Sequence, residues 1–483
     1  MPDPRNWWMY HGNAQHTGAV VQSSLNVNNV RDLTALTPTV LSIGSDTRAA
    51  LSVPALSDGY AYIGTTSGAT GGAFYRISLS SGEIAASKDF PVDISRHPPN
   101  IPGQWPWGTG FASSPAVVDG RVYSALIEGE VLCLDATSLN VIWRTNLVHA
   151  DPAQQQYVEQ GAILAACWTS PLVINGRVYI GCGLGDRSVG ANNVVVSEAG
   201  FGFIYCLDAM TGRVIWLFCT DQESPNPNIP NIPNQIPPSL KSDAAPAQSP
   251  FSYMGVDPSV KGSSVWSSLA YDELLDRVYV GTGNDSPDIL GLPTPLYSNG
   301  LIALAAATGE FVGFFQPSDT DCYRAGDLDV DMSGSPVLFN NSSGTRIVGI
   351  GGKTGSFFLV RADFVGIHLA GADNPSVVVA RRQLLPYCTN TLLVPLSGGL
   401  GSVSSILSLP NDRVPVQAII NPSNPNLDAG DFGIFSVAGI DTNSGRLFVG
   451  IGTADGFDPA TTPFVVHLTG TTWRTLGQLK LSP

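Results

Sequence analysis

A short two-strand pattern recurs along this chain, and it limits the fold more than any other feature. Residues 54–64, 115–125 and 171–181 read PALSDGYAYIG, PAVVDGRVYSA and PLVINGRVYIG. Each has alternating apolar residues on both sides of an Asp-Gly or Asn-Gly pair, a strong signal for a β-hairpin. Few residues are charged (13%) and Gly (52) and Pro (36) are plentiful, which favours short strands joined by turns. The chain is therefore predicted to be all-β.

A second hairpin accompanies the first and aligns between repeats without gaps. It begins at residues 74, 131, 204 and 301, and has a Thr-Gly-type turn and an aromatic residue near its end. Two hairpins make a four-stranded antiparallel sheet, and such sheets bury both faces when they pack face to face around an axis. The sequence thus predicts a β-propeller. Six repeats are clear, including those at 333–360 and 435–456, a degenerate one lies at 401–420, and we expect seven or eight blades.

The whole chain, residues 1–483, is expected to form this single propeller domain. Residues 221–258 are rich in proline and have no periodicity, so we interpret them as an insertion between blades. A surface decoration is the preferred interpretation of this insertion, and a lid over a central site is the alternative.

Composition and simple motifs exclude several classes of function. The formal charge of -15 argues against a nucleic-acid partner, which requires clustered Lys and Arg. No apolar run is long enough to span a membrane, and the start MPDPRNWWMY lacks the pattern of a signal peptide. The seven cysteines form no CxxC or CxxCH motif, so most are expected to be small buried hydrophobic residues. The oligomeric state stays open.

The repeats, with the segment NWWMYHGNAQHTGAVVQSSLNVNNVRDL at 6–33, resemble the quinoprotein alcohol dehydrogenase-like family, which includes polyvinyl alcohol dehydrogenase-like members. The resemblance extends to about residue 361. It implies a propeller that holds pyrroloquinoline quinone (PQQ) on its axis above Ca²⁺ and oxidises a small-molecule alcohol or a polymer substrate. It also implies a periplasmic or secreted protein, and a cytoplasmic location stays open because no signal peptide is visible.

The resemblance assigns roles to five residues. Trp266 precedes Asn284 by eighteen residues, as the quinone-stacking tryptophan and the calcium-binding asparagine of the family do. An indole offers a flat stacking surface, and an amide oxygen suits a hard cation. Lys353 is expected beside the quinone oxygens, and Glu198 or Asp186 is expected to join Asn284 at the metal. The alternatives are inter-blade packing for Trp266, a turn cap for Asn284, and exposed loop positions for the other three.

The chain departs from the family at the general base, the carboxylate that takes the hydroxyl proton. We expect this base at the fifth position of the hairpin that begins at residue 301, where this chain has Ala305. Two other repeats have Asp135 and Asp208 at the same position, where turn chemistry is the simpler interpretation. Replacement bases are available in SDTDCYRAGDLDVDMSG, of which Asp321 and Asp329 are the candidates.

Two further motifs of the family are missing. The sequence has no adjacent cysteines, so the vicinal disulfide of many relatives cannot form, and it has no haem motif. Any electron acceptor must therefore be a separate molecule. Together with Ala305, these departures motivate a second hypothesis, in which the propeller is a non-catalytic binding or scaffolding module.

Overall fold

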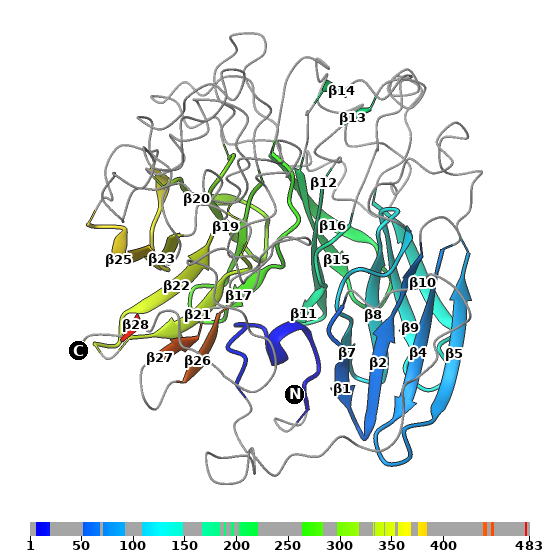
Figure 1. Cartoon of the computed structure of the whole chain (residues 1–483). Helices are drawn as coiled ribbons and strands as arrows, with labels where there is room; N and C mark the ends of the chain where they lie inside the picture. Colours follow the sequence, from blue (N-terminus) through cyan, green and yellow to red (C-terminus); the bar gives the residue numbers. More distant parts are fainter. Residues whose placement is uncertain are drawn as a thin grey trace, which may run out of the picture.

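The computed structural model describes the chain in separate segments and is built almost wholly of strands (Figure 1). The described residues are 6–19, 52–67, 71–91, 109–147, 167–183, 188–189, 195–197, 202–220, 263–283, 297–317, 332, 334–341, 343–352, 356–368, 375–383, 438–441, 446–448 and 479–480. One short helical turn, η1 (Tyr10–Gly12), is the helix among them.

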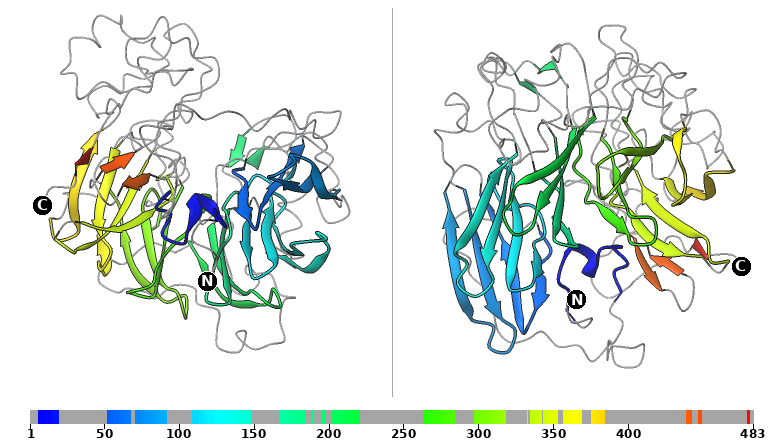
Figure 2. Two further views of the ribbon diagram at one scale, coloured as in Figure 1. Left: turned by 90° about the horizontal axis from the view of Figure 1, so that it is seen from below. Right: turned by 180° about the vertical axis from the view of Figure 1, so that it is seen from behind.

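Sheets with the predicted repeat stand around the N-terminal segment (Figure 2). The first is β1 (Ala55–Ser57), β2 (Tyr60–Gly64), β4 (Gly72–Ser78) and β5 (Ile84–Phe90). The second is β7 (Ala116–Val118), β8 (Arg121–Leu126), β9 (Glu130–Asp135) and β10 (Val141–Asn146). The third is β11 (Leu172–Ile174), β12 (Arg177–Gly183), β15 (Gly202–Asp208) and β16 (Val214–Cys219).

The fourth to sixth sheets repeat this order. The fourth is β17 (Ala270–Asp272), β18 (Arg277–Gly281), β19 (Leu301–Ala305), β20 (Phe311–Phe315) and β24 (Gly366–His368). The fifth is β21 (Val337–Asn340), β22 (Arg346–Gly351), β23 (Ser356–Arg361) and β25 (Val378–Gln383). Of the sixth, β26 (Gly439–Asp441), β27 (Arg446–Phe448) and β28 (Leu479–Lys480) are described. Two short pairs join β3 (Thr66–Ser67) to β6 (Thr109–Gly110) and β13 (Ser188–Val189) to β14 (Val195–Ser197).

The predicted fold class is confirmed: the chain is an all-β propeller of antiparallel, mostly four-stranded sheets. The hairpins predicted from residues 54, 115 and 171, and from 74, 131, 204 and 301, all form. The number of seven or eight blades stays a prediction, as does the single domain. The degenerate repeat at 401–420 and the proline-rich stretch at 221–258 lie outside the described residues.

One sheet departs from the predicted pattern. In the fourth sheet, β24 pairs in parallel with the outer strand β20, which adds a fifth strand. β24 comes from the connection between β23 and β25 of the next blade, which runs along the edge of its neighbour. An open strand edge exposes unpaired backbone groups, and β24 covers this one.

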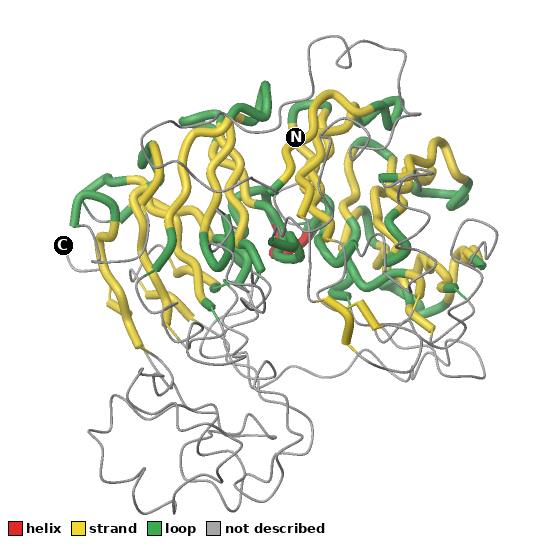
Figure 3. Tube along the Cα trace, turned by 90° about the horizontal axis from the view of Figure 1, so that it is seen from above, coloured by secondary structure: helices red, strands yellow, loops and turns green. Residues whose placement is uncertain are grey.

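The N-terminal segment joins the blades at the middle of the propeller (Figure 3). Backbone N–H groups of the first strands donate at 2.7–2.9 Å to the carbonyl oxygens of this segment, in the pairs Leu56–Trp7, Val117–Trp8, Tyr271–Ala14, Leu338–Gln15 and Ile440–Thr17. The five donors hold the same position in their repeats. The first strand of each of these blades is therefore the innermost one, and the segment closes over the inner strands near their hairpin turns.

Tryptophans near the end of the repeat dock the second blade on the third and the third blade on the fourth. The indole N–H of Trp143 donates to the carbonyl oxygen of Ala209 at 3.0 Å, and that of Trp216 donates to Ala306 at 3.0 Å. A Cβ on Gly212, in the turn of the receiving blade, would lie 2.5 Å from the Trp143 ring. This contact explains both the aromatic residue and the turn glycine of the repeat.

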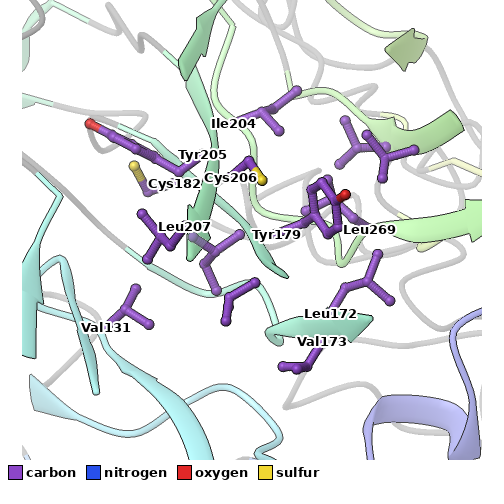
Figure 4. Close-up of a cluster of buried hydrophobic side chains, with 14 of the residues drawn as sticks. Val131, Leu172, Val173, Tyr179, Cys182, Ile204, Tyr205, Cys206, Leu207 and Leu269 are labelled. Carbon is purple, nitrogen blue, oxygen red and sulfur yellow. The ribbon is translucent and has the colours of Figure 1, made fainter. Parts of the chain in front are cut away.

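Apolar side chains from neighbouring blades fill the space between the sheets. Figure 4 shows Val131 of β9, Tyr179 of β12 and Leu207 of β15 together with Leu269 at the start of the fourth blade. Burying a large apolar side chain contributes about 1.5–3 kcal/mol. Four cysteines are buried, as predicted: Cys133, Cys167, Cys182 and Cys206.

A chain of serine hydrogen bonds links five successive blades just before their inner strands. The N–H of Val53 donates to the Ser114 hydroxyl at 3.0 Å, and the N–H of Ser114 donates to Ser170 at 3.0 Å. The N–H of Ser170 donates to Ser268 at 2.9 Å, and the N–H of Ser268 donates to Ser335 at 2.9 Å. These bonds fix the spacing of the inner strands at the end of the sheets opposite to the N-terminal segment.

Candidate functional site

The half-buried indole of Trp266 lies in a short segment, residues 263–268, between the third and fourth blades. The hydroxyl of Thr220, which follows β16 of the third blade, donates to the Ser263 carbonyl oxygen. The N–H of Gly283, which follows β18 of the fourth blade, donates to the Ser264 carbonyl oxygen at 2.8 Å. Both blades therefore hold the segment that carries Trp266.

Gly283 brings the chain against this indole. A Cβ at Gly283 would lie 2.4 Å from the Ser264 hydroxyl oxygen and 3.3 Å from Nε1 of Trp266, and a real Cβ does not fit at the first distance. Glycine suits this position because a side chain would have to displace the Ser264 hydroxyl. The next residue along the chain is Asn284, which lies outside the described residues. The structure thus brings Trp266 beside the residue that precedes its predicted partner.

Most of the predicted site residues fall in parts of the chain that are not described: Asn284, Lys353, Glu198, Asp186, Asp321 and Asp329. Their roles stay predictions. The strands that precede Asp186, Asn284 and Lys353 nevertheless end on the same side of the propeller. β12, β18 and β22 are second strands of their blades, and each runs away from the turn near the N-terminal segment.

Asn299 lies directly across from Gly283. Its N–H donates to the Gly283 carbonyl oxygen at 2.9 Å, which continues the register of β18 and β19 beyond the Gly281–Leu301 pair. Asn299 is 2% exposed, and its Oδ1 has no hydrogen-bond partner. Leaving a buried acceptor without a donor costs about 1–3 kcal/mol. The site therefore contains one polar oxygen that the folded chain does not satisfy.

The expected position of the general base needs a correction. Ala305 pairs with Arg277, whereas Leu301 pairs with Gly281, so Ala305 lies at the opposite end of β19 from Gly283. Four residues of strand span roughly 13 Å. A carboxylate at residue 305 would be remote from Trp266, and its absence therefore says nothing against a reaction beside Trp266.

The aspartates at the equivalent positions have the simpler role. Oδ1 of Asp135 accepts hydrogen bonds from the backbone N–H and the hydroxyl of Ser138, at 2.7 and 2.8 Å. Oδ1 of Asp208 accepts the same pair from Thr211, at 2.8 Å each. The two hydrogen bonds from Ser138 hold the pKa of Asp135 below its usual value. The position is a turn position, as the sequence suggested.

Glu128 is a buried carboxylate that the sequence analysis missed. Both of its carboxylate oxygens lie 3.1 Å from the N–H of Gly110. Burial raises its pKa to about 7, against the opposing effect of the backbone hydrogen bonds. It lies seven residues after the arginine that begins its second strand, as Asn284 and Lys353 do in their own blades. Aligning the repeats from that arginine would have found it.

Trp168 is a second missed residue. It is half-buried and stands in WTSP, which aligns with WSSL at Trp266. The two indoles therefore hold the same repeat position in the third and fourth blades. The sequence contains this signal, because WTSP and WSSL align when the repeats are compared. The two tryptophans were not compared because they stand before the hairpins that define the repeat.

The described residues hold no group of three or more His, Cys, Asp or Glu side chains placed to bind a metal ion. In the same parts of the chain, no helix has the length and apolar character needed to cross a membrane.

The fold is that of a β-propeller, and part of the chain is similar to quinoprotein-type propellers. Residues 163–363 match the family model of the PQQ-type glucose/ethanol/alcohol dehydrogenase β-propeller domain. The chain is 29% identical over 267 residues to the dehydrogenase subunit of a quinone alcohol dehydrogenase from Gluconacetobacter polyoxogenes, covering 53% of this chain and 32% of that protein. It is 31% identical over 208 residues to the quinohemoprotein alcohol dehydrogenase ADH IIB of Pseudomonas putida, covering 42% of this chain and 26% of that protein.

Solved structures agree on the fold. The quinohemoprotein alcohol dehydrogenase ADHIIG from Pseudomonas putida HK5 superposes with a TM-score of 0.56 at 17% identity, covering 93% of this chain and 57% of that one. A europium-containing methanol dehydrogenase gives 0.54 at 16% identity, covering 79% and 59%. These matches confirm the resemblance to the quinoprotein alcohol dehydrogenase-like family of β-propellers. The alignment with the first of the curated relatives spans about a third of that protein's length.

The described residues suit a planar group beside a cation. The indole of Trp266 is half-buried, and the close approach at Gly283 leaves no side chain between it and the neighbouring backbone. The unsatisfied oxygen of Asn299 is the kind of neutral ligand that hard cations accept. An aromatic surface and an amide oxygen are the two features that a quinone and a calcium ion need.

Proposed function

We propose that this propeller is a PQQ- and Ca²⁺-dependent oxidoreductase domain that oxidises an alcohol or a related substrate at its axis. The observation that supports the proposal is the close approach of Gly283 to Trp266, since Gly283 directly precedes the predicted metal-binding residue in the sequence. The match of residues 163–363 to the PQQ-type family model supports it.

Each side chain of the proposed site has one task. Trp266 stacks on the cofactor ring, and Asn284 with Glu198 or Asp186 holds Ca²⁺. Lys353 stabilises negative charge on the cofactor oxygens. PQQ, when bound, supplies the chemistry of accepting a hydride.

A carboxylate close to the cofactor must take the hydroxyl proton of the substrate. Asp321 and Asp329 are the candidates, because they follow the fourth blade on the chain and precede Met332. The N–H of Met332 donates to the Thr282 carbonyl oxygen at 3.1 Å, two residues before Asn284. Met332, which follows these aspartates in the sequence, therefore lies at the same end of the fourth blade as Thr282.

We also propose that a separate molecule accepts the electrons, because the sequence has no haem motif. The proposed substrate is a small alcohol or an alcohol polymer, and the proposed location is the periplasm or the exterior of the cell. The alternative, a non-catalytic binding module, loses part of its basis because Ala305 lies far from Trp266.

Reconstitution tests the proposal. The purified chain is incubated with PQQ and Ca²⁺, and reduction of an artificial dye is followed after an alcohol is added. We expect alcohol-dependent reduction that a calcium chelator abolishes and that Asp321→Asn or Asp329→Asn lowers at least tenfold. Quinone binding without any dye reduction would favour the non-catalytic module, and absence of binding would overturn the proposal.

A further inference from the structure

Asn299 and Asn175 share one backbone conformation but use their side chains differently. Both have a φ of 52°, a left-handed conformation that asparagine tolerates better than most residues. The amide of Asn175 donates to the Tyr271 hydroxyl at 3.3 Å. The Oδ1 of Asn299 is buried and has no hydrogen-bond partner. The backbone conformation accounts for an asparagine at both positions, but it does not account for the unsatisfied oxygen at one of them.

The surroundings of Asn299 indicate what this oxygen serves. Its N–H is bonded to the carbonyl oxygen of Gly283, so Asn299 stands on the strand beside the residue that precedes Asn284. Ser298 and Gly300 on either side are used within the sheet: the Ser298 carbonyl accepts from Gln316 at 2.9 Å, and the Gly300 N–H donates to the Thr282 hydroxyl at 3.0 Å. The fold thus satisfies the neighbours of Asn299 and leaves its carboxamide oxygen available.

We propose that the Asn299 carboxamide oxygen is a further ligand of the cation that Asn284 binds. The inference rests on the proposed function. Calcium takes six to eight oxygen ligands, and amide oxygens of asparagine are among them. The sequence supplies Asn284 and one of two acids, so the cation needs additional oxygens from the protein or from water. An oxygen without a donor on Asn299, across from Gly283, meets that need, and a bound cation would remove the cost of its burial.

Cation binding without quinone tests this inference on the full chain. Terbium, a luminescent substitute for calcium, is titrated against the wild type, Asn299→Gly, Asn299→Asp and the control Asn175→Gly, and calcium is then used to displace it. Asn299→Gly keeps the left-handed backbone accessible and removes the oxygen, so we expect its dissociation constant to rise at least tenfold. Asn299→Asp keeps an oxygen and is expected to bind as tightly as the wild type or more tightly. Asn175→Gly is expected to bind as the wild type does.

Thermal unfolding with and without calcium provides a second readout. Calcium should raise the unfolding temperature of the wild type and of Asn175→Gly, and it should raise that of Asn299→Gly much less. Equal terbium affinity in the wild type and Asn299→Gly would overturn the inference and leave the proposed function intact. A wild type that binds neither cation would overturn the calcium part of the proposed function itself.

Discussion

Nε1 of Trp266 lies 3.3 Å from the position that a Cβ on Gly283 would occupy, and the hydroxyl oxygen of Ser264 lies 2.4 Å from it. Two residues seventeen positions apart in the sequence therefore lie close together at the junction of the third and fourth blades. The contact depends on the absence of a side chain at residue 283. It is the observation on which the proposed cofactor site at this end of the propeller rests.

The first prediction concerns Gly283→Ala. The added methyl group must displace Ser264 or the backbone, so we expect a loss of about 1–3 kcal/mol in the free energy of unfolding. We also expect weaker binding of both PQQ and Ca²⁺, because Asn284 is attached to the displaced residue. Gly439→Ala is the control, since a Cβ there meets no atom within 4 Å. Denaturant unfolding and quinone titration measure the two effects, and equal behaviour of the two variants would contradict the role given to Gly283.

The second prediction concerns the serine hydrogen bonds between blades. Ser268→Ala removes the acceptor of the Ser170 N–H and leaves that buried donor without its partner. We expect a loss of about 1–3 kcal/mol in the free energy of unfolding. Ser80→Ala, in an exposed turn, is expected to change it by less than about 0.5 kcal/mol. Denaturant unfolding of both variants provides the comparison, and a similar small effect in both would mean that the inter-blade bonds do not stabilise the ring.

The third prediction concerns acid stability. His16 is buried, and its ring nitrogen Nδ1 lies 3.0 Å from the Pro336 carbonyl oxygen. Burial, and to a lesser extent the nearby His11, lower the pKa of His16 to about 3 from its ordinary value of 6.5. The unfolded chain therefore binds a proton at this group that the folded chain does not, and the group's contribution to stability falls as the pH drops from 6.5 towards 3.

His16→Asn isolates this contribution, because asparagine tolerates the φ of 58° at this position. Unfolding free energies are measured from pH 7 to pH 4. The wild type should lose more stability than His16→Asn over that range, by up to about 1.4 kcal/mol per pH unit. His368→Asn, at the half-buried end of β24, is the control. Parallel pH profiles for the wild type and His16→Asn would show that the ring at residue 16 does not titrate as predicted.

The fourth prediction concerns Glu128, whose contribution to stability changes with pH in the direction opposite to that of His16. Burial raises the pKa of Glu128 to about 7, so the folded chain retains a proton that the unfolded chain loses above pH 4.5. Its contribution to stability is therefore lost as the pH rises from 4.5 to 7. Glu128→Gln should be more stable than the wild type by about 1–3 kcal/mol at pH 8 and by much less at pH 4. Exposed Glu83→Gln should show no such difference, and a gain at residue 128 that is equal at both pH values would contradict the assignment.

The repeat could be predicted from the sequence because each hairpin is a local pattern. Alternating apolar residues around an Asp-Gly or Asn-Gly turn predict two strands without reference to the rest of the chain. The contacts between blades were harder to predict. The serine hydrogen bonds join residues such as Ser170 and Ser268, which lie 98 positions apart, and nothing local distinguishes them from other serines before a strand.

The candidate site was predicted in part, because contacts between residues far apart in the sequence are again hard to predict. The spacing of Trp266 and Asn284 pointed to one end of the propeller, but the sequence alone did not indicate which end of β19 holds Ala305. Strand pairing settled that point, because Ala305 faces Arg277 and not Gly281. Asn299 was missed because its burial depends on the packing of whole blades, whereas Glu128 was missed because the repeats were not aligned from the arginine of the second strand.

Quinone binding to the wild type tests the central claim most directly. Tryptophan fluorescence is followed while PQQ is titrated into the protein in the presence of Ca²⁺, and the titration is repeated with Trp266→Ala and with Trp143→Phe. Trp143 docks on the third blade through Ala209 and serves as the control. We predict saturable quenching that needs Ca²⁺, persists in Trp143→Phe and is absent in Trp266→Ala. No saturable quenching in the wild type, or the same quenching in Trp266→Ala, would contradict a cofactor site at this indole.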